Sequence, residues 1–188
     1  MSEASTYTSP LERGARYGLI MGLYLSAIFA LQVLMQSYSQ LSLAATIAIF
    51  AFPLVLYRQL RVSQVRSGYK LSYGDLFAQG VLTTLGGAVV SCMVALAYIR
   101  FVQPTYVDDI FNQMIAAYQE ANIPAEDPTL RQLVAMREYG HLPSGSDMCV
   151  LMSSMIVMLG TIISFAAAAL ASRRGRRGGI SSTNRSYL

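Results

Sequence analysis

Hydrophobic positions gather in four long runs along the chain, and polar segments of unequal length separate these runs. The clearest run covers residues 76–99, with no charged residue between Asp75 and Arg100. At about 1.5 Å of rise per residue, a helix of about 24 residues crosses a hydrocarbon layer of about 30 Å. Similar runs at 17–35, 41–57 and 148–171 lead to a prediction of four transmembrane helices.

The predicted fold class is therefore all-α, a polytopic membrane protein with an extracytoplasmic two-helix segment between its third and fourth transmembrane helices. In chain order we expect a cytoplasmic N-terminus (1–16), a transmembrane hairpin (17–57), a basic cytoplasmic loop (58–75), the third transmembrane helix (76–99), the extracytoplasmic amphipathic segment (100–147), the fourth transmembrane helix (148–171) and a basic cytoplasmic tail (172–188).

The extracytoplasmic segment has the pattern of two short helices. In the first, apolar residues recur every four positions, which forms a stripe on one helix face. The second begins at Asp127-Pro128, a capping acid followed by a proline, and ends at Tyr139-Gly140. Exposed apolar surface often marks a binding site. The candidate partner-binding residues are Tyr106, Ile110, Phe111, Met114 and Tyr118. The alternative is that the stripe lies on the outer membrane surface or covers the mouth of the bundle.

Composition and charge support the membrane assignment. Only 13% of the residues are charged, against about 25% in a soluble domain. Of the 14 Lys and Arg residues, all but Arg100, Arg131 and Arg137 fall in the segments expected on one side, which is the positive-inside pattern of an inner-membrane protein with cytoplasmic termini. This clustering favours anionic lipid headgroups over nucleic acid. The candidate headgroup contacts are Arg58, Arg61, Arg66, Lys70, Arg173, Arg174, Arg176 and Arg177.

Small residues recur at helical spacing within the runs. Such residues let membrane helices approach closely, although glycine is also common in membrane helices without that role. The third and fourth helices both carry them, so we expect these two helices to pack together. The candidate packing residues are Gly14, Gly18, Gly22, Gly80, Gly86, Gly87, Gly160 and Ser164.

The sequence contains no phosphate-binding loop, dinucleotide-binding glycines, nucleophile elbow, zinc-protease motif or Cys-x-x-Cys pair. The two cysteines, Cys92 and Cys149, are expected to be free thiols at different depths. We therefore predict no enzymatic activity, cofactor or metal. An enzyme would have to use Arg100, Asp108, Asp109 or His141 at the outer rim.

One stretch has an unusual spacing of glycine, aromatic and serine residues. It reads Gly68-Tyr69-Lys70-Leu71-Ser72-Tyr73-Gly74-Asp75-Leu76-Phe77, with Gly80 after it. Together with the glycine-rich first run, Tyr98-Ile99, Pro104 and the acidic segment, it resembles the DUF4199 family, small four-span membrane proteins found mainly in Bacteroidetes. The resemblance implies an inner-membrane location and four helices. That family has no established catalytic residues to carry over.

Our leading hypothesis is a non-enzymatic anchor or accessory subunit that binds a protein or lipid partner through residues 100–147, with a homo-oligomer also open. The alternative is a small carrier of lipids or other amphiphiles in envelope-lipid metabolism. A carrier needs a groove between helices, and Pro53 with Gly86-Gly87 is its best candidate lining.

Overall fold

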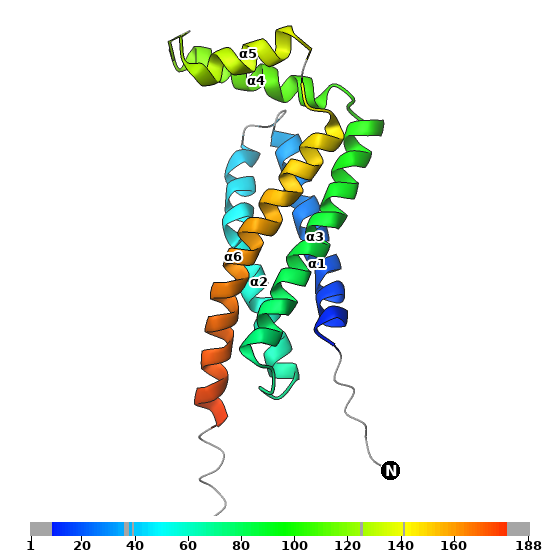
Figure 1. Ribbon diagram of the computed structural model, residues 1–188, viewed down its shortest axis with the longest axis vertical. Coiled ribbons are helices and arrows are strands. Elements are labelled where there is room, and N and C mark those ends of the chain that lie inside the picture. The colour runs from blue at the N-terminus through cyan, green and yellow to red at the C-terminus, as the bar shows by residue number, and fades with distance from the viewer. Residues whose placement is uncertain (1–8, 36–37, 39, 125, 141, 180–188) are drawn as a thin grey trace, which may run out of the picture. The chain divides into compact units, whose positions relative to one another are not determined.

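The computed structural model describes residues 9–35, 38, 40–124, 126–140 and 142–179. Its regular elements over these residues are α-helices without any strand (Figure 1), which confirms the all-α fold class. They are α1 (Pro10–Met35), α2 (Leu41–Arg66), α3 (Tyr73–Phe101), α4 (Tyr106–Glu120), α5 (Pro128–Glu138) and α6 (Gly145–Gly179).

Four of these helices, α1, α2, α3 and α6, are long and apolar enough to cross a membrane, with suitable stretches of 25, 26, 29 and 29 residues. Their surface is apolar: Phe50 is 80% exposed and Leu54 68% exposed, while Gln79 and Thr84 are fully buried. Soluble proteins arrange these residue types in the opposite way. The four predicted spans are thus confirmed as helices able to cross a membrane, and their exposed surface is apolar.

The second span is longer than the hydrophobic run suggested. The hydrophobic run ends at Tyr57, and the sequence assigns residues 58–75 to a basic loop in which residues 59–65 can continue the helix; α2 does continue, to Arg66. Polar residues do not stop a helix that leaves the membrane, and the chain turns only where Gly68 and Tyr69 adopt positive φ angles of 63° and 62°. The connection to α3 is therefore short, and most of the basic residues before it lie on a helix.

Reciprocal caps begin both α3 and α6. The Ser72 backbone N–H donates to Asp75 Oδ2 at 3.0 Å, and the Asp75 N–H donates to Ser72 Oγ at 3.2 Å. Ser144 and Asp147 repeat this arrangement at 3.0 and 3.2 Å. Each pair satisfies N–H groups that the first turn of a helix leaves free. Asp75 is therefore a helix-start acid.

The chain forms two compact units. The first comprises residues 1–91 and 153–188, and the second comprises Cys92–Met152. The first unit therefore contains α1, α2, the first part of α3 and most of α6, whereas α4 and α5 belong to the second.

Two apolar clusters lie inside the first unit. Met21 of α1 packs with Phe52 and Leu56 of α2. Nearer the C-terminal end of α2, Leu60 packs with Leu76 of α3. The same cluster contains Ala167, Ala168 and Ala171 of α6. One face of α2 thus meets α1 and, further along, meets both α3 and α6.

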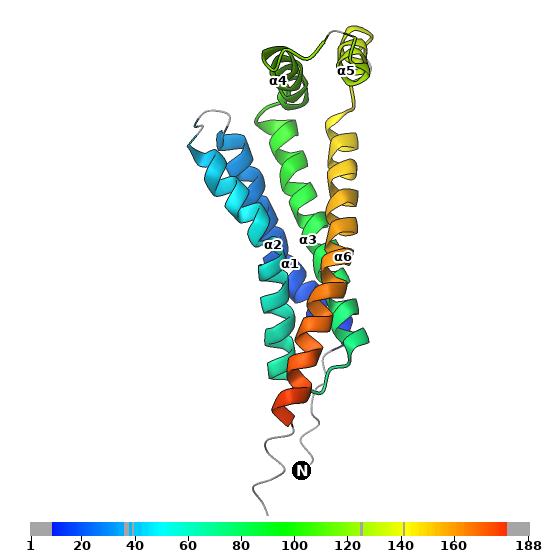
Figure 2. The same ribbon diagram turned by 90° about the vertical axis from the view of Figure 1, so that its left-hand side faces the viewer.

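Pro53 lies inside α2, where it cannot donate the backbone hydrogen bond to the residue four positions earlier. Next to that opened position, the Tyr24 hydroxyl of α1 donates to the carbonyl oxygen of Ala48. Backbone carbonyls in lipid need an internal donor, and a neighbouring helix often supplies it. Tyr24 therefore links α1 to the carbonyls beside Pro53, and Figure 2 shows α2 changing direction along its length.

The three glycines of α1 face α3. A Cβ atom on Gly18 would lie 3.2 Å from the Cα atom of Gly86, and one on Gly14 would lie 2.5 Å from the Cβ atom of Leu82. Gly22 faces the side chain of Val90. Both rows advance by four residues, so α1 and α3 run parallel with matched rows in close contact.

The small residues of α3 divide between two neighbours. A Cβ atom on Gly80 would lie 2.7 Å from Ser164 Oγ of α6, and one on Gly160 would lie 2.6 Å from the Thr84 side chain. Gly86 and Gly87 instead face α1. The expected packing of the third span against the fourth is therefore confirmed at Gly80 and Gly160, whereas Gly86 lies on another face because six residues turn a helix by about 240° from Gly80.

Replacement of Gly18 by Leu should destabilise the bundle by about 1–3 kcal/mol, since its neighbour is backbone that cannot move aside. Ala30→Leu is the matched control, because Ala30 is an exposed position of the same helix. Thermal unfolding in detergent, followed with a thiol-reactive dye on Cys92 and Cys149, would measure the difference. Equal melting temperatures for the two variants would contradict the close α1–α3 contact.

Candidate functional site

In the second unit, α4 and α5 bury their apolar faces against each other. Val107, Phe111 and Ile115 of α4 form one cluster with Leu130 and Leu133 of α5. Figure 2 shows the two helices side by side. The segment between α3 and α6 is therefore a folded helical hairpin with its own core, which we call the α4–α5 hairpin.

The ends of α5 follow from local chemistry. The Asp127 side chain accepts hydrogen bonds from the backbone N–H groups of Thr129 at 2.9 Å and Leu130 at 3.1 Å. Pro128 occupies the first turn, where its missing N–H costs nothing. Gly140 follows the helix with a φ of +65°. The start and end predicted for this helix are confirmed.

The α4–α5 contact changes the interpretation of the candidate partner-binding residues. Tyr106 and Phe111 are buried, with 8% of their surface exposed, so they do not offer a surface. Ile110 and Tyr118 are half-buried, and Met114 is 41% exposed. The α5 helix supplies an apolar face that the sequence pattern could not pair with α4. Part of the α4 surface remains along Ile110, Met114 and Tyr118, which we call the α4 row, although Tyr118 also packs against the α4–α5 cluster.

A chain of polar contacts joins the end of α3 to the start of α4. The Tyr98 hydroxyl donates to Gln103 Oε1 at 2.6 Å, and Gln103 Nε2 donates to Asp109 Oδ2 at 2.9 Å. Thr105 Oγ1 donates to the same carboxylate oxygen at 3.1 Å. Asp109 also lies in the first turn of α4, where a negative charge is favourable. These hydrogen bonds give Asp109 a structural role at the start of α4.

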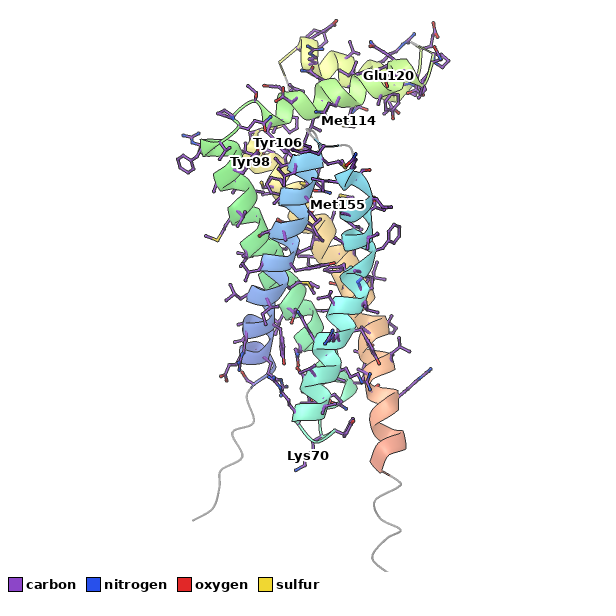
Figure 3. The ribbon with its side chains drawn as sticks, turned by 180° about the vertical axis from the view of Figure 1, so that it is seen from behind. Lys70, Tyr98, Tyr106, Met114, Glu120 and Met155 are labelled. Carbon is purple, nitrogen blue, oxygen red and sulfur yellow. The ribbon has the colours of Figure 1, made fainter. Side chains whose placement is uncertain are left out.

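Tyr98 and Tyr106 meet edge to face, with ring centroids 5.7 Å apart, and Figure 3 shows the two labelled residues next to each other. Burial raises the pKa of the Tyr106 hydroxyl above its ordinary value, and the nearby Tyr98 and Cys149 add to that rise. Tyr106 is therefore neutral at physiological pH and acts as a packed aromatic residue in this unit.

The candidate residues for an enzyme at the outer rim differ in their surroundings. Arg100 and Asp108 are exposed, and Asp109 is engaged in the contacts above. His141 lies outside the described residues. Across the described part of the chain, no three His, Cys, Asp or Glu residues are placed to hold a metal ion.

Cys92 and Cys149 are both free thiols, as expected. Their side chains nevertheless interact with each other, so the expectation that they lie at different depths is wrong. The depth was counted from residues 99 and 148, whereas α3 extends to Phe101 and α6 begins at Gly145. Counting residues from the end of a hydrophobic run does not determine the position of one helix along the axis of the next.

The described headgroup candidates are exposed: Arg58, Arg61, Arg66, Lys70 and Arg173. Figure 3 shows Lys70 on the loop between α2 and α3. The side chains of Arg174, Arg176 and Arg177 lie outside the described residues. Arg58 and Arg61 of α2 lie away from a set of buried polar residues on the same helix, which sequence reasoning missed.

That buried set, the amide cluster, comprises Gln59, Ser63, Gln64, Gln79 and Thr83. Gln79 Nε2 donates to Ser63 Oγ at 2.7 Å, which joins α3 to α2, and Gln64 Nε2 donates to the Leu71 carbonyl oxygen at 3.3 Å. The signal in the sequence was the spacing of four between Gln59 and Ser63 and again between Gln79 and Thr83. The sequence places the residues after Tyr57 outside the bundle and therefore gives no reason to pair them with residues of α3.

The fold defines a class: an all-helical membrane protein with four candidate spans and a helical hairpin between the last two. The chain matches a family model described as a protein of unknown function (DUF4199) over residues 16–173. This match covers more than half of the chain, so the protein belongs to the DUF4199 family. No curated protein and no solved structure matches it.

Phe111→Ala should open the α4–α5 hairpin, because loss of a buried aromatic ring costs about 3–5 kcal/mol. Met114→Ala on the same helix is the control, since Met114 is already 41% exposed. Limited proteolysis should cleave the Phe111 variant within residues 102–147 and spare the Met114 variant. Equal resistance in both variants would contradict a packed hairpin.

Proposed function

We propose that this protein is a non-enzymatic inner-membrane anchor that presents the α4–α5 hairpin outside the cytoplasm to a protein or lipid partner. Three features support the proposal: four candidate spans, a folded hairpin between two of them, and the lack of an assembled catalytic or metal-binding group among the described residues. The anchor needs only that the spans hold the hairpin on one side of the membrane.

The orientation rests on charge. Arg58, Arg61 and Arg66 are exposed on the last turns of α2, and the basic residues after residue 172 lie on the same predicted side. Between α3 and α6 the acids Asp108, Asp109, Glu120, Glu126, Asp127 and Glu138 outnumber Arg131 and Arg137, and Arg100 at the end of α3 is offset by Asp147 at the start of α6. Basic residues are retained on the cytoplasmic side, so the hairpin belongs outside.

The observation that carries the binding role is the α4 row. Ile110, Met114 and Tyr118 follow one another at intervals of four, and none of them is fully buried although α5 covers the adjacent face of α4. Residues four apart share a helix face. An apolar row that the hairpin leaves partly uncovered favours contact with another molecule.

The carrier alternative loses its main support. Gly86 and Gly87 were the candidate lining of a groove, but Gly18 fills the space at Gly86 and Met21 fills the space at Gly87. A carrier would need a different lining. The anchor is therefore the function that the geometry favours.

Reporter fusions would test the orientation. A fluorescent protein joined at the carboxyl terminus should be fluorescent in cells, and alkaline phosphatase inserted after Asn122, between α4 and α5, should be active, because each reporter works on only one side of the membrane. A phosphatase fusion at Lys70 is the control and should be inactive. The reverse pattern would contradict cytoplasmic termini.

Photocrosslinking would test the binding role. A photoreactive residue at Met114 should give one defined adduct in cells, either with a protein, including a second copy of this chain, or with a lipid. The same residue at Phe111 is the matched control, and its burial against α5 should restrict it to products within the chain. No difference between the two positions would contradict a partner at the α4 row.

A further inference from the structure

The amide cluster contains polar groups that no protein atom satisfies. Both amide atoms of Gln59, the Oε1 atom of Gln79 and the hydroxyl of Thr83 are buried without a hydrogen-bond partner. The side chains are 8%, 0% and 1% exposed. Native proteins rarely leave buried groups of this kind unpaired, because burial removes their bonds to water.

These groups lie at two successive helical levels of the bundle. The bond of 2.7 Å between Gln79 and Ser63 fixes the antiparallel register of α2 and α3. Gln59 precedes Ser63 by four residues and Thr83 follows Gln79 by four residues, so each lies one helical turn deeper on the same face. Gln59 and Thr83 therefore occupy the next level after the Ser63–Gln79 bond, yet they do not bond to each other.

The chemistry of the unpaired groups limits what fits between them. The amide oxygens Gln59 Oε1, Gln64 Oε1 and Gln79 Oε1 require hydrogen-bond donors, Gln59 Nε2 requires an acceptor, and the Thr83 hydroxyl can either donate or accept. The cluster itself carries no charge. Asp75, one turn before Gln79, is already engaged with Ser72. A hydroxyl group, which both donates and accepts, matches this set better than an ion.

We propose that the level between Gln59 and Thr83 is a binding site for a small uncharged hydroxyl ligand that bridges α2 and α3. Water and the hydroxyl group of a lipid share this chemistry. Buried waters of this kind make about three hydrogen bonds to groups that are otherwise unpaired. The ligand forms a second connection between the two helices beyond the Ser63–Gln79 bond, in a part of the bundle that contains Leu56, Leu60 and Leu76 as its fully buried apolar residues.

The substitution Thr83→Val tests the site, because the direction of the change in melting temperature depends on whether a ligand is bound. Valine keeps the shape and removes the hydroxyl. If a ligand is bound, the variant loses a hydrogen bond and the melting temperature should fall by about 2–4 °C. If the hydroxyl is truly unpaired, its removal should leave the melting temperature unchanged or raise it, which would overturn the proposal.

Thr84→Val is the matched control. Thr84 is also fully buried, but its hydroxyl bonds to the Gly80 and Val81 carbonyl oxygens of its own helix at 3.2 and 2.9 Å. The proposal requires that Gln59 and Thr83 be coupled and that Gln59 and Thr84 not be. The double variant Gln59→Leu/Thr83→Val should lower the melting temperature by less than the sum of the two single effects. The effects of Gln59→Leu and Thr84→Val should instead be additive. Additivity in both pairs would overturn the bridge.

A second pair of variants keeps the test possible if Thr83→Val does not fold. Thr83→Ser and Thr83→Ala differ only in the hydroxyl group, and the serine variant should melt higher if the ligand is present. Equal melting temperatures for this pair would also contradict the site.

Measurements in three media distinguish water from a lipid as the source of the hydroxyl group. A Thr83→Val effect in delipidated protein in detergent without hydroxyl groups identifies water. An effect only in nanodiscs of phosphatidylglycerol, and not of phosphatidylcholine, identifies a lipid hydroxyl. Absence of the effect in all three media overturns the proposal.

Discussion

Close contact between helix backbones is the constraint on which the first unit depends. Lipid is as apolar as the side chains that face it, so the hydrophobic effect does not hold the helices together, and packing must do so. Gly18 and Gly86 meet backbone to backbone, and Gly80 with Gly160 brings α6 against α3. The helix α3 is thus held on two sides by small residues. Large apolar residues such as Phe50 are left to the outer surface.

The same constraint explains why polar residues lie inside. Small and polar side chains occupy the narrow space between closely packed helices: Ser164 bonds to the Gly160 carbonyl oxygen at 2.6 Å, and Gln79 reaches Ser63 on α2. A hydrogen bond between helices supplies an attraction that apolar contacts in lipid lack. At the end of α2 this produces a helix with buried amides on one face and exposed Arg58 and Arg61 on the other. One helix end therefore both connects the bundle and carries positive charge.

Much of the fold could be predicted from the sequence, because long apolar runs and local caps depend on neighbouring residues only. The four spans, the Asp75 cap and the start of α5 at Asp127 are of this kind. The packing of the helices could not be predicted, because it depends on which helix faces meet. Spacing of four placed Gly86 on a helix face but not against α1, and it revealed the stripe through Phe111 but not that α5 covers it. The amide cluster was missed because Gln59 and Gln79 are distant in sequence and each alone is an ordinary polar residue.

The α4–α5 hairpin shows how such a pairing alters a functional argument. An apolar stripe without a partner favours binding along its full width. Once Leu130 and Leu133 bury Phe111 and Ile115, the stripe has a structural explanation, and only the row through Met114 needs another. The polar contacts of Asp109 likewise account for an acid that could otherwise suggest chemistry. What the folding of the hairpin leaves unexplained is the partly exposed apolar row through Met114 on an acidic hairpin between two candidate spans, and the proposed binding of a partner rests on this row.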